Sequence, residues 1–330
     1  MWIFYNNHLI IMNMSSTTKK ALVLSGGSIK GAYEAGALKA VFEAGFKPEY
    51  LYGISVGNLN STFITHEAAK QFIATGQVDW LKVADELWKF WSTEIDEPKK
   101  LVKQKCNVLL LLSLNWGLIF KKFDSILDTT PLQNLIKKVI DPEVIKKSPV
   151  KLHVGAVNIY NGEIKFVDPL EPNFLDYVVA STAIPIMMPV KNINGIPYLD
   201  GGLRDVAPLG NAINEGADDI VCVCCQSENL DNKTYNYRDL VVLVDKVMDI
   251  IVTEIVNNDV KMINKINELV DEHHGHAGSQ HAKYKHIETT LIRPATEIFL
   301  DIQKFTQVDI INLMNRGYQD AKAKLAGKTW

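Results

Sequence analysis

Cysteine is scarce in this chain, and the arrangement of its cysteines argues against a metal site. Four cysteines occur among 330 residues, and Cys222, Cys224 and Cys225 share one apolar run. Metal-binding cysteines instead come as spaced pairs on turns. We interpret the run as a buried strand whose thiols stay reduced, as in a reducing compartment.

The chain also lacks an excess of charge and any stretch that could cross a bilayer. Its formal net charge of -3 gives no electrostatic argument for a nucleic-acid partner. The apolar run 108–120 is interrupted by Asn115 and is too short to span a membrane, so we interpret it as a core helix. The weaker alternative is an interfacial segment that touches lipid. We therefore expect a cytoplasmic protein, with peripheral membrane contact as an option.

Features of a secretory signal are missing from the first residues. Residues 1–18 start with an apolar stretch, but no positive charge precedes it and no small-residue cleavage pattern follows. We expect this segment to be disordered or wrongly assigned to the chain. No repeat or low-complexity linker marks a later boundary, so residues 19–330 are expected to form one domain.

Strand-like and helix-like patterns alternate along the rest of the chain, which predicts an α/β fold with a mainly parallel sheet between helical layers. The predicted strands are 21–24, 50–54, 151–160, 163–167, 190–193, 196–199, 220–225 and 287–292. The predicted helices are 32–44, 56 onward, 173–182, 240–270 and 306–325. Asn161-Gly162, between two of these strands, predicts a β-hairpin.

The strongest motif is Gly53-Ile54-Ser55-Val56-Gly57, which fits G-x-S-x-G between a predicted strand and a predicted helix. A nucleophilic serine must stand on a sharp strand-to-helix turn, and glycines on either side keep that turn uncrowded. The amides at the start of the following helix favour negative charge nearby. The motif therefore predicts Ser55 as a nucleophile.

A second glycine-rich segment, Gly26-Gly27-Ser28-Ile29-Lys30-Gly31, also lies between a predicted strand and a predicted helix. It is not a dinucleotide-binding loop, since Ser28 replaces a required glycine, and it is not a P-loop, since Ala32 replaces the required lysine. Two interpretations remain: a tight turn without a ligand, or a loop whose amides stabilise an oxyanion. A single oxyanion donor contributes roughly 3–4 kcal/mol.

A third segment, Asp200-Gly201-Gly202, ends a short predicted strand, and alone it would indicate only a turn. The order of the three segments resembles the patatin-like phospholipase family. The likeness extends to the block from Leu24 to Leu38. It also extends to the block from Ala180 to Pro185 upstream of Tyr198-Leu199-Asp200-Gly201-Gly202, which Pro208-Leu209 follow. It covers roughly residues 21–326 and is weakest over 75–150.

The resemblance implies a three-layer α/β/α fold and a lipid acyl hydrolase with a serine–aspartate dyad. Ser55 would attack the ester carbonyl, and Asp200 would accept its proton without a histidine. Gly26, Gly27 and Ser28 would supply the oxyanion amides. Lys30, at the family's basic position, and Gly31 would complete the oxyanion-hole and substrate-binding set, and Gly53 and Gly57 would form the nucleophile elbow. The implied substrate is a lipid or phospholipid, with no metal and no organic cofactor.

Two residues depart from the family's pattern. Ser28 replaces the usual third glycine, which keeps the backbone N–H but restricts the loop. Val206 and Ala207 stand where the family often has an asparagine before the proline, which weakens the expected support behind Asp200. Neither departure removes a catalytic atom.

Two alternatives remain open from the sequence. The order Ser, Asp, His also suits a Ser-His-Asp triad, whose histidine would come from the polar stretch 273–286. The candidates there are His273, His274, His276, His281 and His286. The second alternative is a non-catalytic lipid-binding protein of the same fold. For the acyl chain, residues 109–120, including Trp116, are expected to form a wall or lid.

Overall fold

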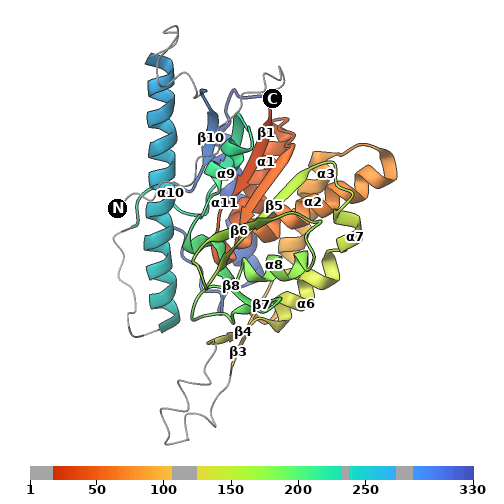
Figure 1. Ribbon diagram of the computed structural model, residues 1–330, viewed down its shortest axis with the longest axis vertical. Coiled ribbons are helices and arrows are strands. Elements are labelled where there is room, and N and C mark those ends of the chain that lie inside the picture. The colour runs from red at the N-terminus through yellow and green to blue at the C-terminus, as the bar shows by residue number, and fades with distance from the viewer. Residues whose placement is uncertain (1–17, 106–124, 232–237, 239, 273–284) are drawn as a thin grey trace, which may run out of the picture.

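The computed structural model describes residues 18–105, 125–231, 238, 240–272 and 285–330 (Figure 1). Its main sheet is built of β1 (Lys20–Leu24), β2 (Tyr50–Ile54), β5 (Lys151–Asn158), β6 (Ile164–Val167), β7 (Lys191–Ile193), β8 (Ile196–Asp200), β9 (Asp219–Val223) and β10 (Glu288–Ile292). A small second sheet pairs β3 (Lys103–Gln104) with β4 (Leu127–Asp128). The helices are α1 (Gly31–Glu43), α2 (Val56–Thr75), α3 (Trp80–Lys89), α6 (Thr130–Val139), α7 (Pro142–Ile145), α8 (Phe174–Ala180), α9 (Leu209–Asn214), α10 (Leu240–Glu272) and α11 (Gln307–Lys324).

The strands follow the order β10-β9-β1-β2-β5-β8-β7, with β6 also paired to β5. From β10 to β5 all neighbours are parallel, whereas β8, β7 and β6 are added antiparallel. Helices cover both faces, so the predicted three-layer α/β/α fold with a mainly parallel sheet is confirmed (Figure 1). The expected hairpin is also present, since β5 and β6 pair across Asn161-Gly162.

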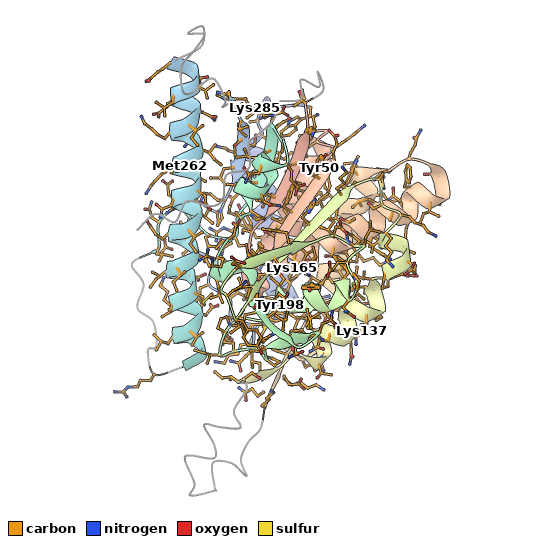
Figure 2. All side chains as sticks on the ribbon, in the orientation of Figure 1. Tyr50, Lys137, Lys165, Tyr198, Met262 and Lys285 are labelled. Carbon is orange, nitrogen blue, oxygen red and sulfur yellow. The ribbon has the colours of Figure 1, made fainter. Side chains whose placement is uncertain are left out.

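Each central strand is buried on both faces, which explains its continuous apolar sequence. In β1, Leu22 and Leu24 enter the core shared with α1, α2, α3 and α11, while Ala21 and Val23 enter a second core. The second core holds residues of α9 and α10, and Cys222 and Cys224 belong to it. Side chains fill the space between the sheet and the helices on either face (Figure 2). The three described cysteines are free and buried, as interpreted from the sequence.

Two glycines allow α1 and α11 to pack with their backbones nearly in contact. A Cβ added to Gly36 would lie 1.8 Å from the Met314 carbonyl oxygen, and one added to Gly317 would lie 2.0 Å from the Tyr33 carbonyl oxygen. Because the backbones cannot yield as a side chain would, both positions require glycine. This contact holds the first helix, and with it the glycine-rich loop that precedes it, against the C-terminal helix.

Several expectations fall outside the described residues. The segment 1–18 lies outside them except for its last residue, and so does the run 108–120 with Trp116. Among the helices of the described residues, none combines the length and the apolar character that a bilayer crossing requires. The expectation of one domain over 19–330 stays a prediction.

The α1–α11 contact gives a stability prediction. Gly317→Ala should lower the free energy of unfolding by about 1–3 kcal/mol, because the added methyl forces the two helices apart. Urea denaturation followed by circular dichroism measures the change. Gly210→Ala in α9 is the control, since a Cβ there meets no heavy atom within 4 Å. Equal stability of the two variants would contradict the close contact.

Candidate active site

Ser55 stands at the turn between β2 and α2, in a conformation that few serines adopt. Its backbone angles are φ 55° and ψ -123°, well outside the helical and strand regions. Glycine is required on both sides, because a Cβ on Gly53 would lie 2.6 Å from Asn58 Cα and one on Gly57 would lie 2.4 Å from the Leu24 carbonyl oxygen. A strained serine on a crowded strand-to-helix turn is the arrangement that G-x-S-x-G predicts.

The sheet register explains why Ser55 and Asp200 meet although 145 positions separate their numbers in the sequence. Ile54 of β2 is level with Gly155 of β5, and Ala156, the next residue of β5, is level with Asp200 of β8. Ser55 and Asp200 therefore flank the same point of β5 from opposite sides. The Asp200 backbone is fixed there by its amide, which donates to the Ala183 carbonyl oxygen at 3.1 Å.

The Asp200 carboxyl is almost completely buried, with 3% of the residue exposed. Burial raises its pKa to about 7, while hydrogen bonds from the Ser55 side chain and the Gly202 amide act in the opposite direction. The Gly202 N–H donates to Oδ1 at 2.8 Å. Ser55 itself is 5% exposed. The Ser55 hydroxyl and the Asp200 carboxyl, whose pKa is about 7, are therefore in contact away from bulk water.

The glycine-rich loop passes directly beside this pair. A Cβ added to Gly26 would lie 3.2 Å from Ser55 Cβ. The Gly26 N–H is already engaged, since it donates to the Val206 carbonyl oxygen at 3.0 Å. In contrast, the amides of Gly27 and Ser28 have no acceptor within the described part of the chain. Of the three predicted oxyanion donors, two are therefore available to a ligand in this conformation.

Ser28 adopts φ 53°, the left-handed region that its glycine-like position demands. The departure from a third glycine thus leaves the loop geometry in place, and Ser28 adds a side chain to the cavity beside Ser55. Gly31, the first residue of α1, has no room for a side chain, because a Cβ would lie 2.2 Å from Val56 Cγ2. The glycine-rich loop and the serine turn therefore pack against each other.

Lys30 has a different environment from the one expected of a substrate-binding residue. Its side chain does not line the cavity at Ser55. It is 3% exposed and pairs with Asp249 of α10 at 2.5 Å. Burial alone would lower the pKa of Lys30, but the charges of Asp249 and Asp245 outweigh it and raise the pKa. Lys30 thus joins the glycine-rich loop to α10.

An apolar cavity leads to Ser55. Its empty volume is about 440 Å³, open solvent at the mouth included. The wall consists of apolar residues from the glycine-rich loop, α2, α6, the segments after α3 and α8, and the segment between β10 and α11. They are Ile29, Val56, Leu59, Trp91, Ile95, Leu101, Val102, Leu132, Ile184, Met188 and Ile302. Ser28, Ser55 and Thr182 are the hydroxyl-bearing residues that line it. The expected wall at residues 109–120 lies outside the described residues.

The described histidines are occupied elsewhere. His153 of β5 stacks on Tyr52 and lies 3.2 Å from Glu215, as expected of a satisfied strand residue. His66 accepts from the Asp141 amide at 3.2 Å. His286 lies 3.0 Å from Asp271, whereas His273, His274, His276 and His281 fall outside the described residues. In the described part of the chain, no group of three His, Cys, Asp or Glu side chains is arranged to hold a metal.

One residue at the site had no role in the sequence interpretation. Ser181, fully buried, accepts the Ser55 backbone N–H through its hydroxyl at 2.9 Å. This bond holds the strained serine turn from the segment after α8. Ser181 belongs to the Ala180–Pro185 block that carries the family likeness, so the block was visible in the sequence although the contact was not.

A comparison with known protein families gives a match over much of the chain. Residues 22–213, more than half of the chain, match the family described as patatin-like phospholipase. The fold and the match define a protein of the patatin-like class. This chain belongs to the patatin-like phospholipase family, which confirms the resemblance carried by the motifs.

Two individual proteins are similar to the chain. The uncharacterized protein YjjU of Escherichia coli (strain K12) is 27% identical over 209 residues, a match that spans 62% of this chain and 51% of YjjU. The chain thus matches about half the length of that curated relative. The crystal structure of VipD from Legionella pneumophila aligns with 94% of this chain and 67% of its own, at a TM-score of 0.42 and 13% identity.

The burial of Asp200 predicts a pH-dependent stability. Its pKa in the folded chain, about 7, lies above the usual 3.8, so the folded state binds this proton more tightly than the unfolded state. The resulting stabilisation is fully present below pH 3.8 and is lost as the pH rises through about 7. Asp200→Asn, which cannot ionise, should therefore exceed the wild type in melting temperature, by a margin that grows from about pH 5 to about pH 8.

Thermal melts of both proteins at the two pH values measure this margin. Asp85→Asn on the exposed side of α3 is the control, since it removes a carboxylate that is 64% exposed and has no comparable burial. If the difference in melting temperature between Asp200→Asn and the wild type stays constant with pH, the surroundings of the Asp200 carboxyl do not favour its protonation.

Proposed function

We propose that this chain hydrolyses carboxylic esters of lipids, as a phospholipase A or lysophospholipase, through a Ser55–Asp200 dyad and an acyl-enzyme. The observation that supports the proposal best is the contact between the Ser55 side chain and a buried carboxyl whose pKa is about 7. Serine is a weak nucleophile until a neighbouring base takes its proton. A base is most effective when its pKa lies near the working pH, and an exposed aspartate would be too weak.

In the proposed reaction, Ser55 Oγ forms a bond to the ester carbonyl carbon while its proton passes to the Asp200 carboxylate. The carbonyl electron pair moves onto the oxygen, where the Gly27 and Ser28 amides are available as donors. Collapse of this intermediate expels the alcohol part of the lipid, which takes the proton from Asp200. A water molecule then repeats the sequence on the acyl-enzyme and releases the fatty acid, with no metal or organic cofactor.

The cavity supports a lipid acyl chain as the substrate group. Its lining is apolar except for three hydroxyl-bearing residues, Ser28, Ser55 and Thr182. Each methylene moved from water into such a cavity contributes about 0.8 kcal/mol. The ester carbonyl would then lie at Ser55 and the acyl chain along Leu59, Leu132 and Met188.

We also propose a peripheral contact with membranes at the mouth of this cavity. Ile186 lies between the cavity residues Ile184 and Met188, is 58% exposed and adopts φ 70°. A β-branched residue in the left-handed region is strained, so an isoleucine displayed there is costly for the fold. Val190, 45% exposed, lies close by in sequence. Insertion of these side chains into a lipid surface would place the cavity entrance next to the substrate.

The first prediction of this proposal concerns Ser55. Ser55→Ala should lower fatty-acid release by about 10³-fold or more, because it removes the nucleophile. The measurement uses a panel of phospholipid, lysophospholipid and monoacylglycerol with mass-spectrometric detection of fatty acid. Wild-type kcat/KM should rise with pH through about 7, the pKa of Asp200.

Histidine substitutions are the matched control. Replacement of His273, His274, His276, His281 and His286 by alanine should leave turnover within about twofold, since the dyad uses no histidine. Loss of turnover in these variants would support the triad instead. Wild-type protein that binds vesicles but releases no fatty acid from any substrate would support the non-catalytic alternative.

A second prediction concerns Ile186. Ile186→Asn should weaken binding to phospholipid vesicles by about tenfold, because burial of one such apolar side chain contributes about 1.5–3 kcal/mol. Asparagine tolerates the left-handed region, so folding should not suffer, and hydrolysis of a water-soluble short-chain ester should be unchanged. Vesicle sedimentation measures the binding. Ile73→Asn at the far end of α2, where the residue is 51% exposed, is the control, and equal binding loss in both variants would refute a specific contact at the cavity.

A further inference from the structure

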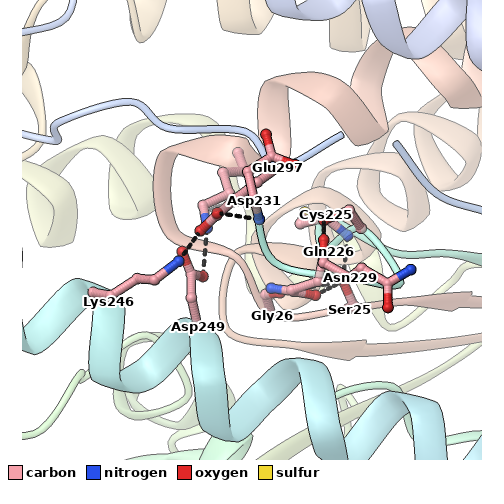
Figure 3. Close-up of polar contacts among 11 residues, drawn as sticks. Ser25, Gly26, Cys225, Gln226, Asn229, Asp231, Lys246, Asp249 and Glu297 are labelled. Atoms are coloured by element: carbon pink, nitrogen blue, oxygen red, sulfur yellow. Dashed lines mark hydrogen bonds and ion pairs between the residues drawn. The ribbon is translucent and has the colours of Figure 1, made fainter. Parts of the chain in front are cut away.

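The segment after β9 holds the carbonyl side of the glycine-rich loop (Figure 3). Gln226 is 4% exposed, and its Nε2 donates to the Gly26 carbonyl oxygen at 2.8 Å. The other end of the same amide group, Oε1, lies 3.5 Å from the Ser25 hydroxyl, which in turn accepts the Cys225 N–H at 2.9 Å. The side-chain amide is thus oriented with its N–H toward the loop.

This contact fixes the direction of the next amide. No cis peptide bond occurs in the described residues, so the peptide between Gly26 and Gly27 is trans and planar. In such a peptide the C=O and the N–H point in opposite directions. With the Gly26 carbonyl held by Gln226, the Gly27 N–H is turned to the other side of the loop, where it has no acceptor among the described residues.

Three further contacts prevent the peptide from rotating. On one side, the Gly26 N–H is bonded to the Val206 carbonyl oxygen. On the other side, the Gly27 carbonyl oxygen accepts the Lys30 N–H at 3.0 Å. Gly27 also packs so tightly that an added Cβ would lie 2.3 Å from Cys225 Cβ. Two side chains donate to the Gly26 carbonyl oxygen: Gln226 Nε2 at 2.8 Å and, at the longer distance of 3.2 Å, the Ser25 hydroxyl. Gln226 makes the shorter of these two bonds.

Gln226 is itself fixed from two other elements. Arg293, just after β10, donates through Nε to the Gln226 carbonyl oxygen at 3.1 Å and through Nη2 to the Ser227 carbonyl oxygen at 2.6 Å. Its Nη1 donates to Asn257 of α10 at 2.9 Å. Gln226, which donates to the Gly26 carbonyl, therefore belongs to a hydrogen-bonded network with Arg293 and Asn257. All three residues lie outside the family-matched residues 22–213.

We infer that Gln226 is a positioning residue for the oxyanion hole, which it sets by holding the Gly26 carbonyl so that the Gly27 N–H faces the reacting carbonyl. The inference rests on the proposed function. A hydrogen bond to the carbonyl also polarises the peptide and strengthens the N–H on its far side as a donor. Gln226 would contact neither the substrate nor Ser55. Its loss would nevertheless raise mainly the energy of the transition state, in which negative charge develops on the carbonyl oxygen.

The test uses the full chain with Gln226→Met, which has a similar volume but no donor. Active sites are first counted with a fluorophosphonate that labels Ser55. We expect kcat on a soluble ester to fall about 10- to 100-fold, while KM stays within about twofold of the wild-type value. This decrease in kcat is no larger than the decrease caused by removal of a whole oxyanion donor. Unchanged kcat per active site overturns the inference.

A pair of inhibitors separates positioning from a general structural effect. A trifluoromethyl ketone with an alkyl chain binds as a hemiketal, in which Ser55 Oγ bonds to the carbonyl carbon, the proton passes to Asp200 and the oxygen becomes an anion. The corresponding carbinol occupies the same cavity without forming that anion. Gln226→Met should weaken the ketone in parallel with kcat/KM and leave the carbinol unchanged, and equal weakening of both overturns the inference.

Gln226→Glu provides a second variant if the first fails to fold. Its carboxyl can donate to the Gly26 carbonyl only when protonated, so the ratio of variant kcat to wild-type kcat should fall as the pH rises. A ratio independent of pH counts against the inference. Gln307→Met is the matched control, since it removes a glutamine donor to another backbone carbonyl, that of Ser92 at 2.7 Å, and no contact to Gly26.

Different results would refute the proposed function and the positioning role of Gln226. Wild-type protein without ester hydrolysis, or Ser55→Ala with wild-type activity, refutes the proposed function. Ser55-dependent hydrolysis together with full kcat in Gln226→Met refutes the positioning role of Gln226 alone.

Discussion

The site depends on one constraint: a carboxyl kept out of water beside a hydroxyl. In the proposed reaction Asp200 is an effective base because burial raises its pKa to about 7, and the sheet around it creates that burial. β5 lies between β2 and β8 and brings their ends level, so that neither Ser55 nor Asp200 needs a long or flexible segment to reach the other. The antiparallel addition of β8 to a parallel sheet is what places the end of its strand at this point.

The same edge of the sheet collects the remaining parts of the site. β1 ends at the glycine-rich loop, β2 at the serine turn and β9 just before Cys225 and Gln226. The carboxyl ends of parallel strands share one edge, which is where α/β folds place their ligands. Backbone strain at Ser28, Ser55 and Ile186 is found at this edge, and packing around these residues must maintain it.

Sequence reasoning reached those parts of the structure that local patterns encode. Apolar runs and glycine-rich turns predicted the strands, the hairpin at Asn161-Gly162 and the α/β class, because these signals depend on neighbours in the chain. The three motifs predicted which residues gather around Ser55. Contacts between residues far apart in the chain leave no local pattern in the sequence. Lys30 was expected at the substrate, but it pairs with Asp249. The Gly26 amide was expected as an oxyanion donor, but it donates to the Val206 carbonyl oxygen. Gln226 belongs to no motif, and its role follows only from the strand order that puts β9 next to β1.

The Lys30–Asp249 pair has a consequence for where this fold can be divided. The family match ends at residue 213, yet the ammonium buried inside the matched part has its counter-charge on α10, beyond that limit. A fragment cut at the limit would keep Lys30 but lose both Asp249 and α10, and with them the contact that joins the glycine-rich loop to this helix. It would also lose β9, which covers one edge of β1. Recombination of the family-matched part with a related chain would therefore have to carry the lysine and its distant aspartate together.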